Sequence, residues 1–199
     1  MKNKFVNYFS SISPLSEEES KAILDSMCIK TFEKGAFLLK EGKISLDTYF
    51  ILEGCVREFI VIDGEEKSTN FFTEEQWVIS LNNFGPQNAS THNLVCVEDT
   101  TVCVGNEQQA QLMFKRFPRF ETISRAIVES DFANQKKLLM SYLTDSPEQR
   151  YIKLLETRPY IFQRVPQYQI ASYIGVKPES LSRIRKRISK NGNILRLDS

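Results

Sequence analysis

The residues best suited to chemistry in this sequence are the basic ones in the stretch VPQYQIASYIGVKPESLSRIRKRISKNG, which runs from Val165 to Gly192. Lysine and arginine are frequent there, and Glu179 is the only acidic residue. Arginine can donate two hydrogen bonds to a guanine edge, glutamate can accept one from a cytosine amino group, and further cations can neutralise phosphates. The pattern therefore predicts non-covalent recognition of an anionic polymer, above all double-stranded DNA.

Two short helices must position these side chains. Pro166 can begin the first helix, Gly175 interrupts it, and Pro178 can begin a second helix that runs to about Lys190, before Asn191-Gly192. A turn of about four residues that contains glycine is typical of a helix-turn-helix motif. Helices with this spacing predict a DNA-binding domain.

A helical wheel of the second helix separates an apolar side from a charged one. Leu181, Ile184 and Ile188 lie together, with Ala171 small enough to allow a close helix crossing. The alternative is a basic helix that is merely solvated. The glycine turn and the regular spacing of apolar residues on the inner side occur together with the charge, and this combination favours DNA binding. The residues expected to contact DNA are Gln167, Lys177, Glu179, Ser180, Ser182, Arg183, Lys186, Arg187 and Lys190.

The charge of the chain is divided in the same way. Net charge is +1, yet residues 147–199 carry eleven Lys or Arg against four Asp or Glu, which leaves the rest of the chain acidic. An anionic partner is therefore expected for the C-terminal part alone. We predict three segments: a β-roll effector domain over 1–117, a connecting helix over 118–144 and a helix-turn-helix domain over 145–199.

Residues 31–104 are rich in β-forming segments separated by glycines, as in an all-β barrel or sandwich. The sequence VIDGEE predicts a hairpin, because Asp63-Gly64 supplies the positive φ values of a tight turn. The expected fold class is α+β, with an N-terminal antiparallel, jelly-roll-like β-roll flanked by helices, a long connecting helix and a C-terminal helix-turn-helix domain.

The connecting helix has two apolar stripes where a surface helix needs one. Phe120, Ile123 and Ile127 form the first and are our candidates for a homodimer contact. Val128, Phe132, Leu139 and Tyr142 form the second. Coverage of both stripes by the β-domain is the alternative. Ser130, Asn134 and Lys137 continue the heptad from Ile123, so a long coiled coil is not predicted firmly.

A β-rich domain, a long helix and this helix-turn-helix together resemble the cyclic-AMP receptor/FNR (CRP/FNR) family of transcription regulators. FEKGAFLLKEGKISLDTYFILEGCVREFIVIDGEE is similar to the first half of the family's cyclic-nucleotide-binding β-roll, and IGVKPESLSRIRKRI to its recognition region. The resemblance implies that Glu179 and Arg183 read bases. Pro178 stands where cyclic-AMP-responsive members usually have another arginine, which implies a different operator preference.

The effector site departs from the family pattern. Cyclic-nucleotide binders hold the ribose with a glutamate and the phosphate with an arginine, but WVISLNNFGPQNASTHNLVCVEDTTV has no Arg or Lys and no Glu before Glu98. Burying a phosphodiester without a cation would cost several kcal/mol. We therefore expect no response to cyclic AMP. The stretch is either a degenerate structural cassette or a pocket for another ligand, whose candidate residues are Trp77, Ser80, Asn82, Asn83, Asn88 and Ser90.

Other classes of function find little support in the sequence. There is no phosphate-binding loop and no nucleophile elbow, so we expect no enzyme. The four scattered cysteines are expected to be core thiols, and no metal or cofactor is predicted. We find no signal peptide or membrane span and expect a cytoplasmic protein. The sequence NILRLDS after Gly192 predicts a wing that is reduced or absent.

The resulting prediction is a homodimeric regulator that binds a pseudo-palindromic operator, with an unknown small-molecule effector if any. RNA polymerase is a further partner that such a regulator could contact, and no residue pattern identifies the surface involved. The alternative function is a small-molecule-binding or protein-interaction module of the same fold whose basic helix is merely solvated.

Overall fold

The computed structural model describes residues 2–79 and 89–190. Eight strands and eight helices occur in this part of the chain. In chain order they are α1 (Lys2–Ile12), α2 (Glu17–Ser26), β1 (Cys28–Phe32), β2 (Phe37–Leu39), β3 (Asp47–Glu53), β4 (Val56–Ile62), β5 (Glu65–Phe72), β6 (Trp77–Val78), β7 (Asn93–Cys96), β8 (Thr100–Asn106), α3 (Glu107–Arg116), α4 (Arg119–Thr144), α5 (Pro147–Thr157), α6 (Ile161–Arg164), α7 (Gln167–Ile174) and α8 (Pro178–Lys190).

The strands form two antiparallel sheets, with the orders β1-β8-β3-β6 and β2-β7-β4-β5. Apolar side chains from both sheets, among them Ile51, Val56 and Val102, are fully buried between them. The predicted hairpin joins β4 to β5, and Asp63 and Gly64 have φ values of 53° and 79°. The predicted antiparallel β-roll is confirmed.

Local sequence signals explain several helix ends. Ser16 and Glu19 form the reciprocal hydrogen bonds of a capping box at the start of α2. Ser146 and Gln149 do the same for α5, which has Pro147 at its first turn. These caps satisfy backbone N–H groups that a helix start would otherwise leave without partners.

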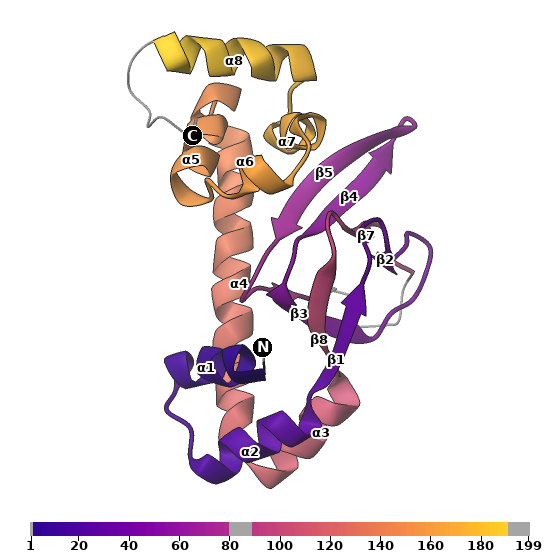
Figure 1. Cartoon of the computed structure of the whole chain (residues 1–199), viewed down its shortest axis with the longest axis vertical. Helices are drawn as coiled ribbons and strands as arrows, with labels where there is room; N and C mark the ends of the chain where they lie inside the picture. Colours follow the sequence, from indigo (N-terminus) through magenta and orange to yellow (C-terminus); the bar gives the residue numbers. More distant parts are fainter. Residues whose placement is uncertain (1, 80–88, 191–199) are drawn as a thin grey trace.

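The long helix α4 runs beside the β-roll and connects the lower helices α1, α2 and α3 to the group α5–α8 (Figure 1). Phe120, Ile123 and Ile127 are at most 7% exposed and pack with Phe5 of α1 and Phe50 of β3. Our candidates for the dimer contact are therefore part of the chain's own core. The other stripe of α4 is the one left open.

The group α5–α8 shares a core with the β-roll. Phe71 of β5 is fully buried, and its ring lies 5.3 Å from that of Tyr173 in α7. Cys55 and Val97 join the same cluster from the β-roll, while Leu181 joins it from α8. The DNA-binding candidate is thus fixed to the sheet by burial of apolar surface, and Figure 1 shows α7 next to the β4–β5 hairpin.

Among the described helices none is long and apolar enough to cross a membrane. Of the four cysteines, Cys55, Cys96 and Cys103 are buried as expected, whereas Cys28 is exposed. Cys28 lies at the beginning of β1, where its side chain is outside the core. The expectation of a core thiol is wrong for this residue.

Candidate nucleic-acid interface

The helix α7, its turn and α8 form the site that the sequence analysis pointed to. Gly175 ends α7 in the left-handed conformation, with a φ of 82°, and its N–H bonds back to the carbonyls of Ala171 and Ser172. The N–H of Val176 also bonds to the Ala171 carbonyl, at 2.9 Å. These bonds satisfy the carbonyl groups at the end of α7 and turn the chain sharply into α8.

The inner face of α8 is apolar and buried. Leu181 is 2% exposed, and Ile184 and Ile188 are each 8% exposed. They pack against Ile170 and the fully buried Ala171 of α7. Full burial of one large aliphatic side chain stabilises a fold by about 1.5–3 kcal/mol. Burial of these three side chains therefore fixes which side of α8 faces α7.

An arginine connects the end of α7 to the end of α4. Arg150 of α5 donates from Nε to the Ile174 carbonyl at 2.9 Å and from Nη1 to the Asp145 carbonyl at 2.5 Å. Its guanidinium lies over the Tyr142 ring, and the Tyr142 hydroxyl donates to the Tyr173 carbonyl. Burial raises the pKa of Tyr142 to about 12, so the phenol keeps the proton that it donates.

The outer face of α8 is exposed. Glu179, Ser182, Arg183, Lys186 and Lys190 all lie there. Within the described ranges no ion pair involves Arg183, Lys186 or Lys190. Three cations without anionic partners on one face of a helix are available to phosphates and bases.

The other residues that we predicted to contact DNA lie around the exposed face of α8. Gln167 is exposed at the start of α7, Lys177 is exposed just before α8, and Ser180 is half-buried in its first turn. Lys177 lies close enough to Glu65, in the β4–β5 hairpin, to contribute to lowering the pKa of Glu65, after the larger effect of Lys67. The exposed face of α8 and its preceding turn therefore lies beside the β4–β5 hairpin.

Arg187 has a structural partner. Its Nε donates to Glu148 of α5 at 3.0 Å, and its Nη2 donates to the second carboxylate oxygen of the same residue. This bidentate pair holds α8 against α5, so Arg187 is a weaker candidate for phosphate than its neighbours. Arg185 is also exposed and was absent from our candidates, but residues two apart on a helix do not share a face, and Arg185 lies beside Tyr151 of α5 instead of beside Arg183.

Polar contacts fix this domain to the β-roll. Arg164 of α6 donates from Nη1 and Nη2 to the two carboxylate oxygens of Glu74, each at 2.8 Å, and from Nε to Glu98 at 2.9 Å. Burial acts to raise the pKa of Glu74, but hydrogen bonds from Arg164 and from the Gly54 N–H outweigh it, so the pKa lies below its usual range. Ser172 bonds to the β5 backbone, accepting from the Ser68 N–H at 2.9 Å.

The effector candidates lie apart from this face. Trp77 packs against Phe5 and Phe50, and Ser90 is buried and donates to the His92 carbonyl. Four further candidates, Ser80, Asn82, Asn83 and Asn88, lie outside the described residues. The expected reduced wing after Gly192 also lies outside them.

Two acidic groups, on β4 and on α4, lie close enough to interact. Glu58 of β4 accepts a hydrogen bond from Thr69 at 2.7 Å, and His92 Nε2 lies 3.7 Å from its other carboxylate oxygen. Burial and, to a smaller extent, the charge of Glu58 raise the pKa of Asp131 on α4. Two carboxylates that interact across this space create a negative potential, which disfavours a phosphate.

One domain model and several solved structures are similar to this chain. Residues 29–117 match the cyclic nucleotide-binding domain model. No curated protein is similar enough in sequence to count as a relative. The chain has the fold of the CRP/FNR regulators.

Three of these structures cover nearly the whole chain. FixK2 from Bradyrhizobium japonicum has a TM-score of 0.71 at 12% identity, over 87% of this chain and 89% of its own. The c-di-GMP responsive global regulator CLP from Xanthomonas campestris has a TM-score of 0.70 at 14% identity, over 92% and 96%. A crp/fnr family structure from Eubacterium rectale has 0.69 at 16% identity, over 96% and 91%. At these identities, the three structures show that this chain shares their fold.

Proposed function

We propose that the protein is a sequence-specific DNA-binding transcription regulator that acts as a homodimer and does not respond to cyclic AMP or cyclic GMP. The observation that carries the proposal is the unpaired basic face of α8, whose inner face is buried against α7. A helix in this position of a helix-turn-helix enters the major groove with its N-terminal residues toward the bases. Glu179 and Arg183 then read base edges, and Lys186 and Lys190 contact phosphates.

Selection of operators from a random duplex library tests DNA binding. Wild type should enrich a palindromic motif, and Arg183→Ala should lose discrimination at one position per half-site, at a cost of about 1–3 kcal/mol. Lys186→Ala should weaken binding to all sequences and lower the salt dependence by about one counterion per protomer. Lys115→Ala removes the same charge from the exposed side of α3 and should change neither property.

Enrichment of no motif by wild type, with equal effects of the variants at positions 183 and 115, would contradict specific DNA binding. It would favour the solvated basic helix instead. Retained binding of a small molecule in the same preparation would then support the ligand-binding module as the function.

The open stripe of α4 supports the homodimer. Within this stripe Val128, Phe132, Leu139 and Tyr142 are 38%, 70%, 59% and 36% exposed. Leu143, which is 73% exposed, extends the stripe, so that apolar residues recur at intervals of four and seven. Such spacing is typical of a helix that packs along a second helix. A paired α4 would place two copies of α8 on one side of the dimer, as a palindromic operator requires.

Sedimentation velocity tests this contact. Phe132→Asp places a charge in the stripe and should convert the dimer to a monomer that binds DNA weakly. Ala126→Asp places the same charge on an exposed position about a third of a turn or more away from the stripe and should leave the dimer intact. A wild-type monomer at all accessible concentrations, or a dimer that survives Phe132→Asp, would refute the α4 interface.

The absence of cations from the matched cassette supports the lack of response to cyclic nucleotides. In residues 77–79 and 89–102 there is no Lys or Arg, and Glu58 and Asp131 lie across the space between sheet and helix. Cyclic AMP would have to bury its phosphate beside carboxylates. Isothermal titration with cyclic AMP should therefore give no binding heat, and operator affinity should be unchanged; a saturable titration would refute this part of the proposal.

A further inference from the structure

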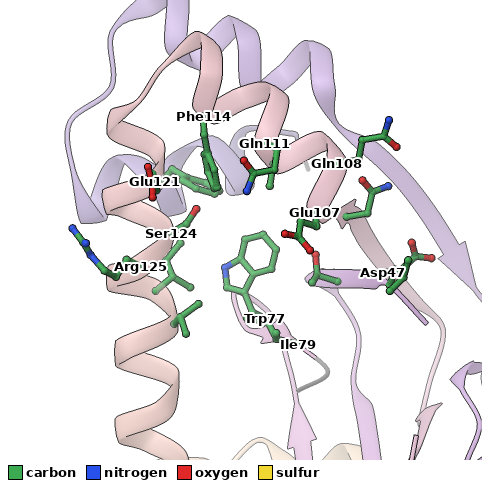
Figure 2. A pocket seen from close by; sticks show the side chains of 17 residues that line it. Asp47, Trp77, Ile79, Glu107, Gln108, Gln111, Phe114, Glu121, Ser124 and Arg125 are labelled. Carbon is green, nitrogen blue, oxygen red and sulfur yellow. The ribbon is translucent and has the colours of Figure 1, made fainter. Parts of the chain in front are cut away.

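A cavity of about 700 Å³ lies between α1, α3, α4 and the end of β6. Its volume falls within the range of about 300–1,000 Å³ that is usual for small-molecule sites. Figure 2 shows the Trp77 ring in its middle, with side chains of α3 and α4 around it. The cavity borders residues 121–128 of α4, whereas Asp131 lies farther along the helix, where it interacts with Glu58 of β4.

The floor and walls of the cavity are aromatic and aliphatic. Trp77 is the only tryptophan of the chain, and its ring packs edge-on against Phe9 with centroids 6.3 Å apart. Phe114, Ile127 and Val128 add apolar surface from α3 and α4. The Trp77 indole N–H is buried and makes no hydrogen bond of good geometry in the described chain, although the Tyr8 hydroxyl lies near it. A flat aromatic ligand would complement the apolar surface of the cavity.

The rim of the cavity is charged and mainly acidic. Glu107 of α3, and Glu121 and Arg125 of α4, have no ion-pair partner within residues 2–79 and 89–190. Asp47 adds a further carboxylate, and Figure 2 shows Glu107 and Asp47 on one side of Trp77, with Glu121 and Arg125 on the other. Glu107 and Glu121 alone already outnumber the one guanidinium, so the rim attracts a cation and disfavours a phosphate or carboxylate ligand.

We propose that this cavity is a binding site for a flat aromatic or heteroaromatic compound that carries a positively charged amine. The aromatic ring stacks on Trp77 between the apolar walls, and the amine pairs with the carboxylates of the rim. The aromatic floor and the negative rim recognise different parts of the ligand: the ring gains aromatic contact with the indole, and the ammonium group gains ion pairing with the carboxylates. The site lies outside the β-roll interior, and its occupation does not depend on whether the protein binds DNA.

The fluorescence of Trp77 reports on the cavity without any label, because this residue is the only tryptophan. The probes are 4-nitrobenzylamine and 4-nitrobenzoate, which share a quenching ring and differ in the sign of their charge. Wild type should show saturable quenching by the amine at submillimolar concentration, and the benzoate should bind at least about tenfold more weakly. Free tryptophan titrated in parallel corrects for absorbance and collisional quenching.

Two variants test the location of the probe. Ala110→Phe fills the cavity from α3 and should abolish saturable quenching by the amine, while Leu112→Phe places the same ring at an exposed position of α3 outside the cavity and should not. Circular dichroism of the variants shows that they are folded. Saturable quenching that persists in Ala110→Phe would place the probe elsewhere and overturn the proposal.

A further pair tests the charge preference. The double variant Glu107→Gln with Glu121→Gln should reduce the preference for the amine over the benzoate, and Glu129→Gln, outside the cavity on exposed α4, should preserve it. Failure of both probes to quench in a saturable manner, or equal affinity for the two in wild type, would overturn the proposal. If the amine binds Phe132→Asp but not wild type, a second copy of the chain fills the cavity, and this too would overturn it.

Discussion

Adjacent phenylalanines of β5 offer a direct test of how the group α5–α8 is held against the β-roll. Phe71 is fully buried toward α7, where it contacts Tyr173, whereas Phe72 is 7% exposed and packs inside the β-roll with Val56 and Leu94. Successive side chains of a strand point to opposite faces of the sheet. Phe71→Ala and Phe72→Ala therefore remove the same kind of ring from two different cores at adjacent positions of one strand.

The two substitutions should lower the free energy of unfolding by similar amounts, but each should weaken a different core. Truncation of a buried phenylalanine to alanine costs about 3–5 kcal/mol, which for a chain of this size lowers the melting temperature by roughly 6–20 °C. In Phe71→Ala the loss should be local to the contact between β5 and the group α5–α8. In Phe72→Ala it should lie between the two sheets.

Hydrogen exchange measured by mass spectrometry distinguishes the two sites. Phe71→Ala should accelerate exchange in α7 and α8 by about 10²-fold or more, with a smaller effect on β3 and β8, and Phe72→Ala should show the opposite order. If both variants accelerate exchange in the same segments by the same factor, the two cores unfold as one unit. The assignment of Phe71 to a separable docking contact would then be refuted.

Two further predictions concern the same region. Arg164→Gln should destabilise docking by about 1–3 kcal/mol at neutral pH, because it breaks a bidentate pair, and Arg116→Gln, in an exposed pair, by less than about 1 kcal/mol. The pKa of Glu74 is lowered by folding, so this stabilisation is complete above the unfolded-state pKa and is lost as pH falls through the folded value; a difference between wild type and Arg164→Gln in urea melts that persists at the lowest pH would contradict it. Gly54→Ala should destabilise by more than about 3 kcal/mol, because a Cβ there would lie 2.6 Å from a backbone carbon, whereas Gly64→Ala meets nothing within 4 Å and should cost only about 1 kcal/mol for its positive φ; equal thermal shifts would refute the steric argument.

Features fixed by local chemistry could be predicted from the sequence. The ends of α7 and α8 follow from Pro166, Gly175 and Pro178, and the β4–β5 turn follows from Asp63-Gly64. Each of these residues restricts its own backbone dihedral angles, so a single sequence shows the result. The helix-turn-helix and most of its exposed residues are therefore recognisable from the order of the amino acids alone.

Features fixed by distant contacts could not be predicted in the same way. The two stripes of α4 are both apolar, and only the packing of Phe5 and Phe50 decides that Phe120 belongs to the inner one. Helix α1 has no capping signal in its sequence and is held by aromatic contacts such as that between Phe5 and Phe50, with ring centroids 4.9 Å apart. The pairing of Arg187 with Glu148 joins residues 39 apart and has no local signature.

The core shared by β5 and α7 also has an entropic consequence. Two modules joined by a flexible linker lose rotational freedom when a second molecule fixes their relative orientation, and that loss weakens binding. Here Phe71, Tyr173 and the hydrogen bonds of Ser172 fix the orientation of α8 when the chain folds. Helix α8 is therefore preorganised relative to the β-roll. The entropy cost of ordering the two parts opposes folding of the protein instead of its association with a partner.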